Sequence, residues 1–230
     1  MRLLVTRPKD DAAPLAAELR ALGHDVVLAP VMTIVELADA ALPIEGVQAV
    51  LATSANGVRA LARRTARRDL PLYAVGDVTA RTARDAGFAQ VRSAEGDVEA
   101  LARLVVQSLD PARGPLLHVT GSVAAGDLSG RLQALGFAVR RAVLYRAEPA
   151  TALTPEAEAA LKAGTLDGVL LFSPRTARLF VELARGVNLR TVSAYCLSQA
   201  VREAAAPGGF ARLIVAARPD QTSLLATLKA

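Results

Sequence analysis

Short apolar runs, each followed by small or hydroxyl residues and then by an amphipathic stretch, recur along this chain. Residues 49–52 are apolar at every position, which is typical of a strand buried on both faces. Residues 53–57 suit a tight turn and a helix N-cap, and Val58, Leu61 and Ala62 then fall on one helix face. The pattern predicts a strand that runs directly into a helix, whose free backbone N–H groups attract anions.

The same pattern recurs at residues 167–180, where an apolar run is followed by Ser173 and a second apolar helix face. Pro174 suits the first turn of that helix, because its missing N–H costs nothing there. Other units also occur twice and in the same order. The matched segments are 21–24 with 134–137, and 71–77 with 193–199.

This repeated order predicts an α/β fold with two similar open parallel sheets of the flavodoxin-like kind, each of about five strands. Such sheets bind ligands at the carboxyl ends of their strands, so the expected site is a cleft between the two sheets. The pattern also predicts a weak strand at 88–91 and a last strand with its exit at 215–219. It assigns residues 31–42 to an extended connector.

The chain has 230 residues, of which 52% are hydrophobic, enough for one large or two small domains with a real core. No apolar run approaches the ~18 residues of a membrane span, and the first residues are too short for a signal peptide. We therefore expect a soluble cytoplasmic protein with no membrane partner. Cys196 is the single cysteine and there are two histidines, which argues against a disulfide or a metal site.

The net charge is +5, and all but three of the 27 basic residues are arginines. A nucleic-acid partner would explain the charge, but aromatic residues make up 3% of the chain and tryptophan is absent. Scattered arginines fit an anionic small molecule better. A compositional preference for arginine and alanine is the third explanation, and it accounts for most of the arginine count.

Several familiar catalytic motifs are missing. The chain has no G-x-G-x-x-G after its first strand, no phosphate-binding G-x-x-x-x-G-K-[ST] and no G-x-S-x-G elbow. His118 lies in the middle of a predicted strand, which favours a buried, hydrogen-bonded side chain over a catalytic base. Cys196 lies in an apolar strand, which favours a core position over a nucleophile.

The remaining candidates are residues at predicted strand ends. For each one alone, a role as a helix cap or turn former is at least as good an explanation as a ligand contact. Together, at one edge of two sheets, they predict a cleft lined by N–H donors and hydroxyls that could hold a polyanion. They are Arg7, Ser54, Asn56, Gly57, Gly76, Thr79, Gly121, Ser122, Ser173, Arg175 and Ser198.

Five segments, taken in order, resemble the uroporphyrinogen-III synthase family. Each is weakly specific alone, but the ordered set spans nearly the whole chain. They are Val5-Thr6-Arg7-Pro8, Thr53-Ser54-Ala55-Asn56-Gly57-Val58, Val75-Gly76-Asp77-Val78-Thr79-Ala80, Val143-Leu144-Tyr145-Arg146 and Phe172-Ser173-Pro174-Arg175-Thr176-Ala177.

The resemblance implies cyclisation of hydroxymethylbilane, a linear tetrapyrrole with two carboxylates on each ring, to uroporphyrinogen III with inversion of the last ring and loss of water. It implies no metal, no cofactor and, we expect, a monomer. The repeat order alone would allow two tandem domains. The family instead implies a first domain of residues 1–33 and 149–230, a second of 34–148, and a hinge of two strands at 31–36 and 145–148.

The resemblance also implies roles for particular residues. Tyr145 would donate a proton to the departing hydroxyl or orient it, although a hydrogen-bonded hinge tyrosine is an equal alternative. Thr79 would contact the leaving group or a carboxylate, and Ser54 and Ser173 would be matched contacts in the two domains. Ser198 stands where many relatives carry a threonine-containing turn. The alternative function is a non-enzymatic two-domain sensor of an anionic small molecule.

Overall fold

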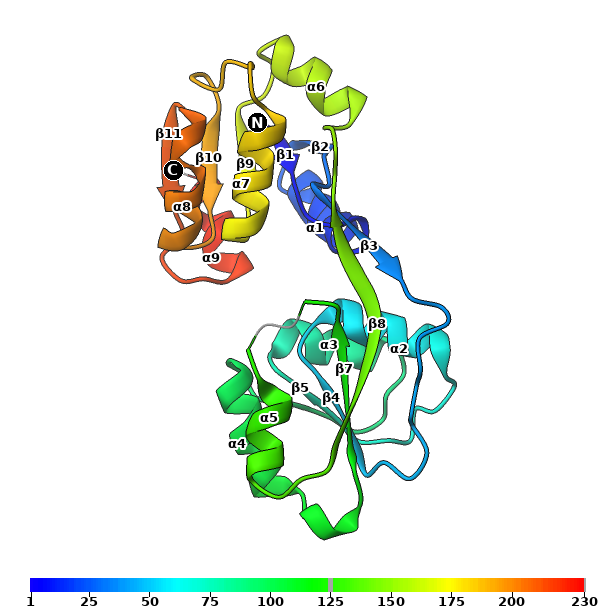
Figure 1. Cartoon of the computed structure of the whole chain (residues 1–230). Coiled ribbons are helices and arrows are strands. Elements are labelled where there is room, and N and C mark those ends of the chain that lie inside the picture. The colour runs from blue at the N-terminus through cyan, green and yellow to red at the C-terminus, as the bar shows by residue number, and fades with distance from the viewer. Residues whose placement is uncertain (124–125, 230) are drawn as a thin grey trace. The chain divides into compact units, whose positions relative to one another are not determined.

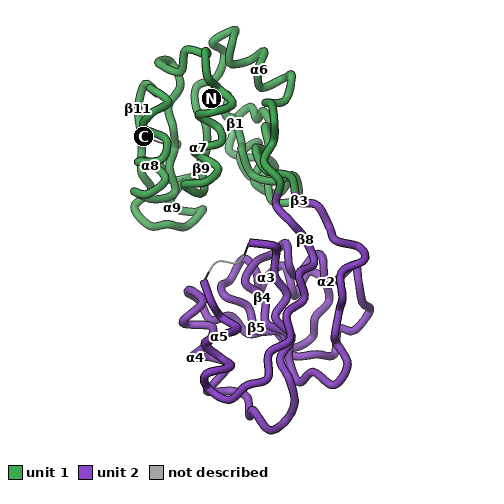
Figure 2. The backbone as a smooth tube through the Cα atoms, in the orientation of Figure 1, with its two compact units in different colours: residues 1–33, 148–230 green, residues 34–147 purple. Residues whose placement is uncertain are grey.

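The computed structural model describes residues 1–123 and 126–229, and the chain divides into two compact units. Unit 1 comprises Met1–Thr33 and Glu148–Ala230, and unit 2 comprises Ile34–Ala147 (Figure 2). The chain passes between the units twice, within strands β3 (Met32–Glu36) and β8 (Val139–Pro149). These two strands are hydrogen-bonded neighbours in one sheet.

Unit 1 is built on a five-stranded sheet with the strand order β11-β10-β9-β1-β2, in which all neighbouring strands are parallel (Figure 1). Its strands are β1 (Arg2–Val5), β2 (Asp25–Leu28), β9 (Gly168–Leu171), β10 (Ser193–Cys196) and β11 (Arg212–Val215). Its α-helices are α1 (Lys9–Ala21), α6 (Pro155–Lys162), α7 (Pro174–Leu183), α8 (Gln199–Ala205) and α9 (Gln221–Ala226).

Alternation along the strands places the core of unit 1. Leu3 and Val5 lie two residues apart in β1 and so share one face, where they pack with Leu15 and Leu19 of α1 and with Leu224 of α9. Helices α7 and α8 pack side by side and contact β9 and β10. The short 3₁₀ turns Ala206–Gly208 and Thr227–Lys229 follow α8 and α9.

Unit 2 is built on a six-stranded sheet with the order β3-β8-β7-β4-β5-β6. Besides β3 and β8, its strands are β4 (Ala49–Ala52), β5 (Leu72–Ala74), β6 (Val91–Ser93) and β7 (Leu116–Gly121). Its helices are α2 (Ala55–Arg64), α3 (Asp77–Asp85), α4 (Val98–Ser108) and α5 (Leu128–Ala134), with a 3₁₀ turn at Pro111–Arg113.

Strand β4 is buried on both faces, as its unbroken apolar run predicts. Val50 and Ala52 belong to the core cluster that contains α2 and α3, whereas Ala49 and Leu51 belong to the cluster that contains α4 and α5. Both faces of this sheet are therefore covered by helices. The prediction of an α/β fold with two open parallel sheets is confirmed.

Three element predictions are wrong in detail. The connector that the apolar pattern predicts at 31–42 contains strand β3, which joins the larger sheet and gives it a sixth strand; the hinge strand that the resemblance implies at 31–36 is present. The weak strand expected at 88–91 is instead Val91–Ser93, because Phe88 packs into the core beneath α3. The last strand is Arg212–Val215, because these residues pair in register with Ser193–Cys196.

Within residues 1–123 and 126–229, none of the helices combines the length and the apolar character needed to cross a bilayer.

Candidate active site

Four neighbouring strands of unit 2 bring predicted site residues to one edge of its sheet. Strands β8, β7, β4 and β5 lie in this order and run parallel. One predicted site residue lies at or just beyond the last paired residue of each strand: Tyr145 on β8, Gly121 on β7, Ser54 after β4 and Gly76 after β5. Because the carboxyl ends of parallel strands share an edge, residues from four separate segments meet there.

Tyr145 makes the closest of these contacts. Its phenol oxygen lies 2.8 Å from Ser54 Oγ. Its ring lies against Gly121, where an added Cβ would stand 2.7 Å from the Tyr145 Cζ atom. Tyr145 lies within the long strand β8 rather than at the end of a strand, but it marks the last β7–β8 pair, opposite Gly121.

A bulge shapes this corner of the sheet. The register between β7 and β8 shifts at Thr120 and Gly121, and the N–H of Ser122 donates a hydrogen bond to the carbonyl oxygen of Tyr145 at 2.9 Å. The Ser122 side chain is exposed. A bulge bends the strand and re-aims its side chains, so it fixes the direction of the tyrosine ring.

The start of α2 lies beside this tyrosine. Ser54 is the N-cap, and its Oγ accepts from the N–H of Gly57 at 3.0 Å. An added Cβ at Gly57 would come within 3.3 Å of the Val119 carbonyl oxygen, so a small residue suits the close approach of α2 to β7. Asn56 accepts from Arg59 Nη1 through its side-chain oxygen at 2.7 Å. Ser54 and Gly57 thus join the tyrosine cluster, and Asn56 is held by its own helix.

Helix α3, which follows the next strand β5, differs from α2 at its start. Its N-cap is Gly76, with a φ of −160°, and no side chain caps the first turn. Such a turn presents free N–H groups that suit an anion. Thr79, the third residue of α3, is 5% exposed, so only a small part of its side chain is open to a ligand.

Unit 1 has a corresponding edge, called its rim here, where the carboxyl ends of strands β10, β9 and β1 lie side by side in its sheet. Ser173 caps α7 by accepting from the N–H of Thr176 at 3.1 Å, within a capping box. Ser198 caps α8 by accepting from the N–H of Val201 at 3.4 Å. Arg175 is exposed in the first turn of α7. The capping role expected for these serines is confirmed.

Arg7 is held by partners that the sequence did not reveal. It lies in a half-buried position with its guanidinium 4.9 Å from the centre of the Phe172 ring. Arg7 Nη2 lies 3.3 Å from Asp11 Oδ2, and Nη1 donates to Gln221 Oε1 at 3.2 Å. The ion pair offsets part of the charge that Arg7 could offer to an anion. Gln221 is far along the chain, so no local pattern could have indicated this contact.

The two residues expected to be non-catalytic are buried. His118 is 3% exposed, and its Nδ1 lies 3.0 Å from Ser129 Oγ. Burial lowers the pKa of His118 to about 4, and the nearby charge of Arg141 adds to this effect. Burial raises the pKa of the Cys196 thiol to about 11, so the thiol stays protonated at neutral pH. The core interpretation of both residues is confirmed.

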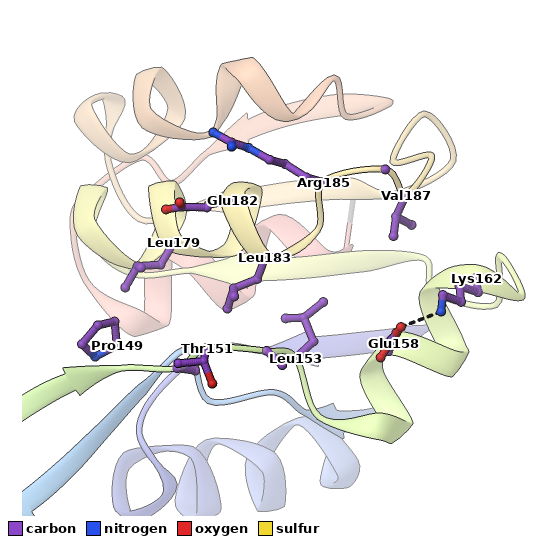
Figure 3. A pocket seen from close by; sticks show the side chains of 13 residues that line it. Pro149, Thr151, Leu153, Glu158, Lys162, Leu179, Glu182, Leu183, Arg185 and Val187 are labelled. Atoms are coloured by element: carbon purple, nitrogen blue, oxygen red, sulfur yellow. Dashed lines mark hydrogen bonds and ion pairs between the residues drawn. The ribbon is translucent and has the colours of Figure 1, made fainter.

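A cavity of about 770 Å³ lies elsewhere in unit 1 (Figure 3). Leu153, Leu179 and Leu183 line it between α6 and the second half of α7, and the ion pair of Glu158 with Lys162 stands at one side. None of the predicted site residues lines this cavity. Across residues 1–123 and 126–229, no three His, Cys, Asp or Glu side chains are grouped to hold a metal ion.

The fold and its rims define a class: a two-unit α/β protein whose strand-end loops present hydroxyls and backbone N–H groups suited to an anionic ligand. Comparisons with known proteins agree. A family model described as uroporphyrinogen-III synthase HemD matches residues 13–226. No curated protein sequence gives a match.

Solved structures share the fold. Uroporphyrinogen-III synthetase from Helicobacter pylori has a TM-score of 0.67 at 17% identity, covering 100% of this chain and 99% of that one. A mutant uroporphyrinogen III synthase from the extremely thermophilic bacterium Thermus thermophilus has a TM-score of 0.54 at 20% identity, covering 100% and 97%.

This chain belongs to the uroporphyrinogen-III synthase family. It is accordingly a cyclising hydro-lyase of tetrapyrrole biosynthesis that converts hydroxymethylbilane into uroporphyrinogen III. The alternative of a non-enzymatic sensor has no support in the comparisons.

Proposed function

We propose that the chain catalyses this cyclisation at the rim of unit 2, with Tyr145 assisting departure of the hydroxyl. The observation that supports the proposal is the position of the Tyr145 phenol, which lies 2.8 Å from Ser54 Oγ at an edge formed by four strand ends. The start of α3 at Gly76 lies on the same edge and lacks a side-chain cap, so its N–H groups are open to a carboxylate.

The reaction needs little acid catalysis from the protein. The pyrrole nitrogen expels the hydroxyl of the first ring and gives an electrophilic azafulvene. The last ring attacks it through its substituted carbon to form a spiro intermediate, which fragments and recloses with that ring inverted. A neutral phenol is a weak acid, so Tyr145 donates a hydrogen bond to the departing oxygen rather than a free proton.

Control of geometry is the larger task, because the linear substrate closes without inversion when no enzyme guides it. Holding a flexible chain in one folded shape is catalysis by positioning. We propose substrate contacts from Ser122 and Thr79 in unit 2 and from Arg7, Ser173, Arg175 and Ser198 in unit 1. We further propose a cytoplasmic monomer that needs no metal, cofactor or nucleic acid.

The decisive assay follows the isomer produced. Purified protein incubated with enzymatically made hydroxymethylbilane should give mainly the type III product, whereas the spontaneous reaction gives type I. After oxidation, the two porphyrins can be separated and measured by chromatography. A product mixture equal to that of the protein-free reaction would contradict the proposal.

Replacing Tyr145 by phenylalanine tests its role. Tyr145→Phe removes the hydrogen-bond donor but keeps the ring, and we expect kcat to fall by about 10- to 100-fold, the scale of one lost hydrogen bond to a group that gains charge. Tyr195→Phe is the matched control, because the Tyr195 hydroxyl contacts Met1 Sδ at 3.7 Å in unit 1. An unchanged kcat in Tyr145→Phe would remove Tyr145 from the chemical step.

A further inference from the structure

We infer that Ser54 is a positioning residue that acts through Tyr145 rather than on the substrate. In this arrangement the Ser54 hydroxyl donates its proton to the Tyr145 phenol oxygen, which leaves the phenol proton free to point at the departing hydroxyl. The inference rests on the proposed function of Tyr145. It assigns Ser54 a task that neither helix capping nor substrate binding includes.

The hydrogen bonds around Ser54 support this direction. A serine hydroxyl has one proton and two acceptor sites. The N–H of Gly57 already donates to Ser54 Oγ at 3.0 Å, and the Tyr145 oxygen lies 2.8 Å away from the same atom. A hydroxyl that accepts a hydrogen bond is polarised and becomes a stronger donor. The bond from the Gly57 N–H therefore strengthens the bond that Ser54 donates to Tyr145, and this bond in turn makes the Tyr145 phenol a stronger donor.

The position of this series on α2 adds to the effect. Ser54 caps the start of a ten-residue helix, where the helix macrodipole is positive. Negative charge that develops on the phenol oxygen as its proton is shared is therefore stabilised by Ser54 and by the helix start. Because this charge appears only during the reaction, the interaction accelerates the chemical step rather than tightening substrate binding.

Gly121 holds the ring from the other side. A Cβ on Gly121 would stand 2.7 Å from Tyr145 Cζ and 2.8 Å from Cε2, distances that real Cβ atoms do not show. The backbone of Tyr145 is fixed as well, since its carbonyl accepts from the N–H of Ser122. The absence of a side chain at Gly121 is thus what allows the phenol to reach Ser54. We assign Gly121 the same positioning role.

The proposed step balances. The C–O bond of the hydroxymethyl group breaks with its electron pair on oxygen, while electron density from the pyrrole nitrogen forms a double bond between the methylene carbon and the ring. The phenol donates a hydrogen bond to the departing oxygen and keeps its proton, and the pyrrole N–H proton passes to that oxygen, which leaves as water. Ser54 keeps its own proton throughout and only donates a hydrogen bond.

Kinetics of three variants test the inference. Ser54→Ala should lower kcat about tenfold, which corresponds to one lost hydrogen bond, with KM within about twofold of the wild type. Ser54→Thr retains the hydroxyl and should keep most of the activity. The double variant Ser54→Ala with Tyr145→Phe should be no slower than Tyr145→Phe alone, because Ser54 acts only through the phenol.

Loss of the helix cap needs its own control. Asp110 Oδ1 accepts from the N–H of Ala112 at 2.9 Å and caps the 3₁₀ turn before β7, at the opposite edge of the sheet. Asp110→Ala also removes a cap but should leave kcat unchanged. If Asp110→Ala lowers kcat as much as Ser54→Ala does, a general loss of stability explains both variants and the inference is wrong.

A spectroscopic measurement separates contact with Tyr145 from contact with substrate. The chain has three tyrosines, so the ¹³Cζ resonance of Tyr145 can be assigned by its loss in Tyr145→Phe. Ser54→Ala and Gly121→Ala should each shift this resonance in the substrate-free enzyme, whereas Asp110→Ala should not.

The remaining outcomes are distinct. A raised KM with unchanged kcat and an unmoved resonance in Ser54→Ala would make Ser54 a direct substrate contact and overturn the inference. An equal loss from Ser54→Ala on the wild-type and Tyr145→Phe backgrounds would also overturn it. If Tyr145→Phe has no effect on kcat, the proposed role of Tyr145 itself fails, and this result can be told apart from both Ser54→Ala outcomes.

Discussion

His118 is a buried histidine with one satisfied nitrogen. Its Nδ1 is paired with Ser129, whereas Nε2 is buried without a hydrogen-bond partner among the residues that the structure describes. Burial, helped by the charge of Arg141 and opposed by Asp127, lowers its pKa from 6.5 to about 4. In the folded protein the ring is therefore neutral at pH 7.

The lowered pKa makes stability depend on pH. The unfolded chain binds a proton at His118 below about pH 6.5, but the folded chain does so only below about pH 4. Acid therefore favours unfolding across this window, by up to about 3 kcal/mol. We expect the free energy of unfolding in urea to fall as the pH is lowered from 6.5 to 4, and His118→Gln should lose most of this slope.

The second histidine provides the control. The pKa of His24 is also lowered, by partial burial and by the N-terminal charge, but His24 is less deeply buried, so His24→Gln should lose a smaller part of the slope than His118→Gln does. Parallel stability curves for wild type and His118→Gln would contradict the assignment.

The sequence indicated the candidate site residues but not the side chains that they contact. Ser54, Gly121 and Tyr145 were each identifiable from the turn pattern or the family resemblance. Their mutual contact was not, because 91 positions separate Ser54 from Tyr145. The pairing depends on β8 and β4 both flanking β7, which only the sheet order decides. Arg7 with Phe172 and Gln221 is a second case of the same kind.

At the level of elements, the strand–turn–helix units were predictable because their signals are local. Ser54 and Ser173 both cap the helices that follow buried strands, and Pro174 occupies the first turn of α7 as expected. The predicted segments share only one residue each with strands β6 and β11, because both strands lie at sheet edges, where burial is incomplete and the apolar pattern is weak.

Gly168 tests how tightly strands β9 and β10 pack. A Cβ there would lie 2.5 Å from Tyr195 Cε2 and 3.1 Å from the Ser193 carbonyl oxygen, and neither the ring nor the backbone can move easily. Gly168→Ala should lower the free energy of unfolding by about 1–3 kcal/mol, the usual cost of overpacking. Urea denaturation measures this change.

Gly76→Ala is the matched control for stability. An added Cβ at Gly76 has only the Gly96 carbonyl oxygen nearby, at 3.9 Å, and the backbone is extended. Alanine is a poorer N-cap than glycine, so the free energy of unfolding of Gly76→Ala should fall by at most about 1 kcal/mol, less than in Gly168→Ala. Equal stability of the Gly168 and Gly76 variants would show that the β9–β10 contact is looser than described.

At the level of the whole molecule, net charge should govern capture of the substrate. The chain carries +5 at pH 7, and the substrate carries carboxylates on every ring. Long-range attraction raises the association rate and weakens as salt screens it. We expect kcat/KM to fall by several-fold between about 20 and 300 mM KCl, a range over which the Debye length shortens strongly.

Initial rates at low substrate concentration measure this effect, with an uncharged osmolyte as the control for viscosity and water activity. A kcat/KM that does not change with salt would show that scattered arginines do not steer the substrate. The arginine content would then reflect composition alone.

The sequence by itself determined the repeated strand–turn–helix units, the two parallel sheets and the helix caps, because these follow from periodicity and from turn chemistry within a few residues. Only the tertiary structure decided which turns meet. The division of the chain into unit 1 and unit 2 depends on β3 and β8, whose pairing joins distant segments and leaves no local trace, so the repeat pattern left it open and only the family resemblance implied it. The contact of Tyr145 with Ser54 across β7 has the same origin, since spatial neighbours in a sheet are set by strand order rather than by distance along the chain.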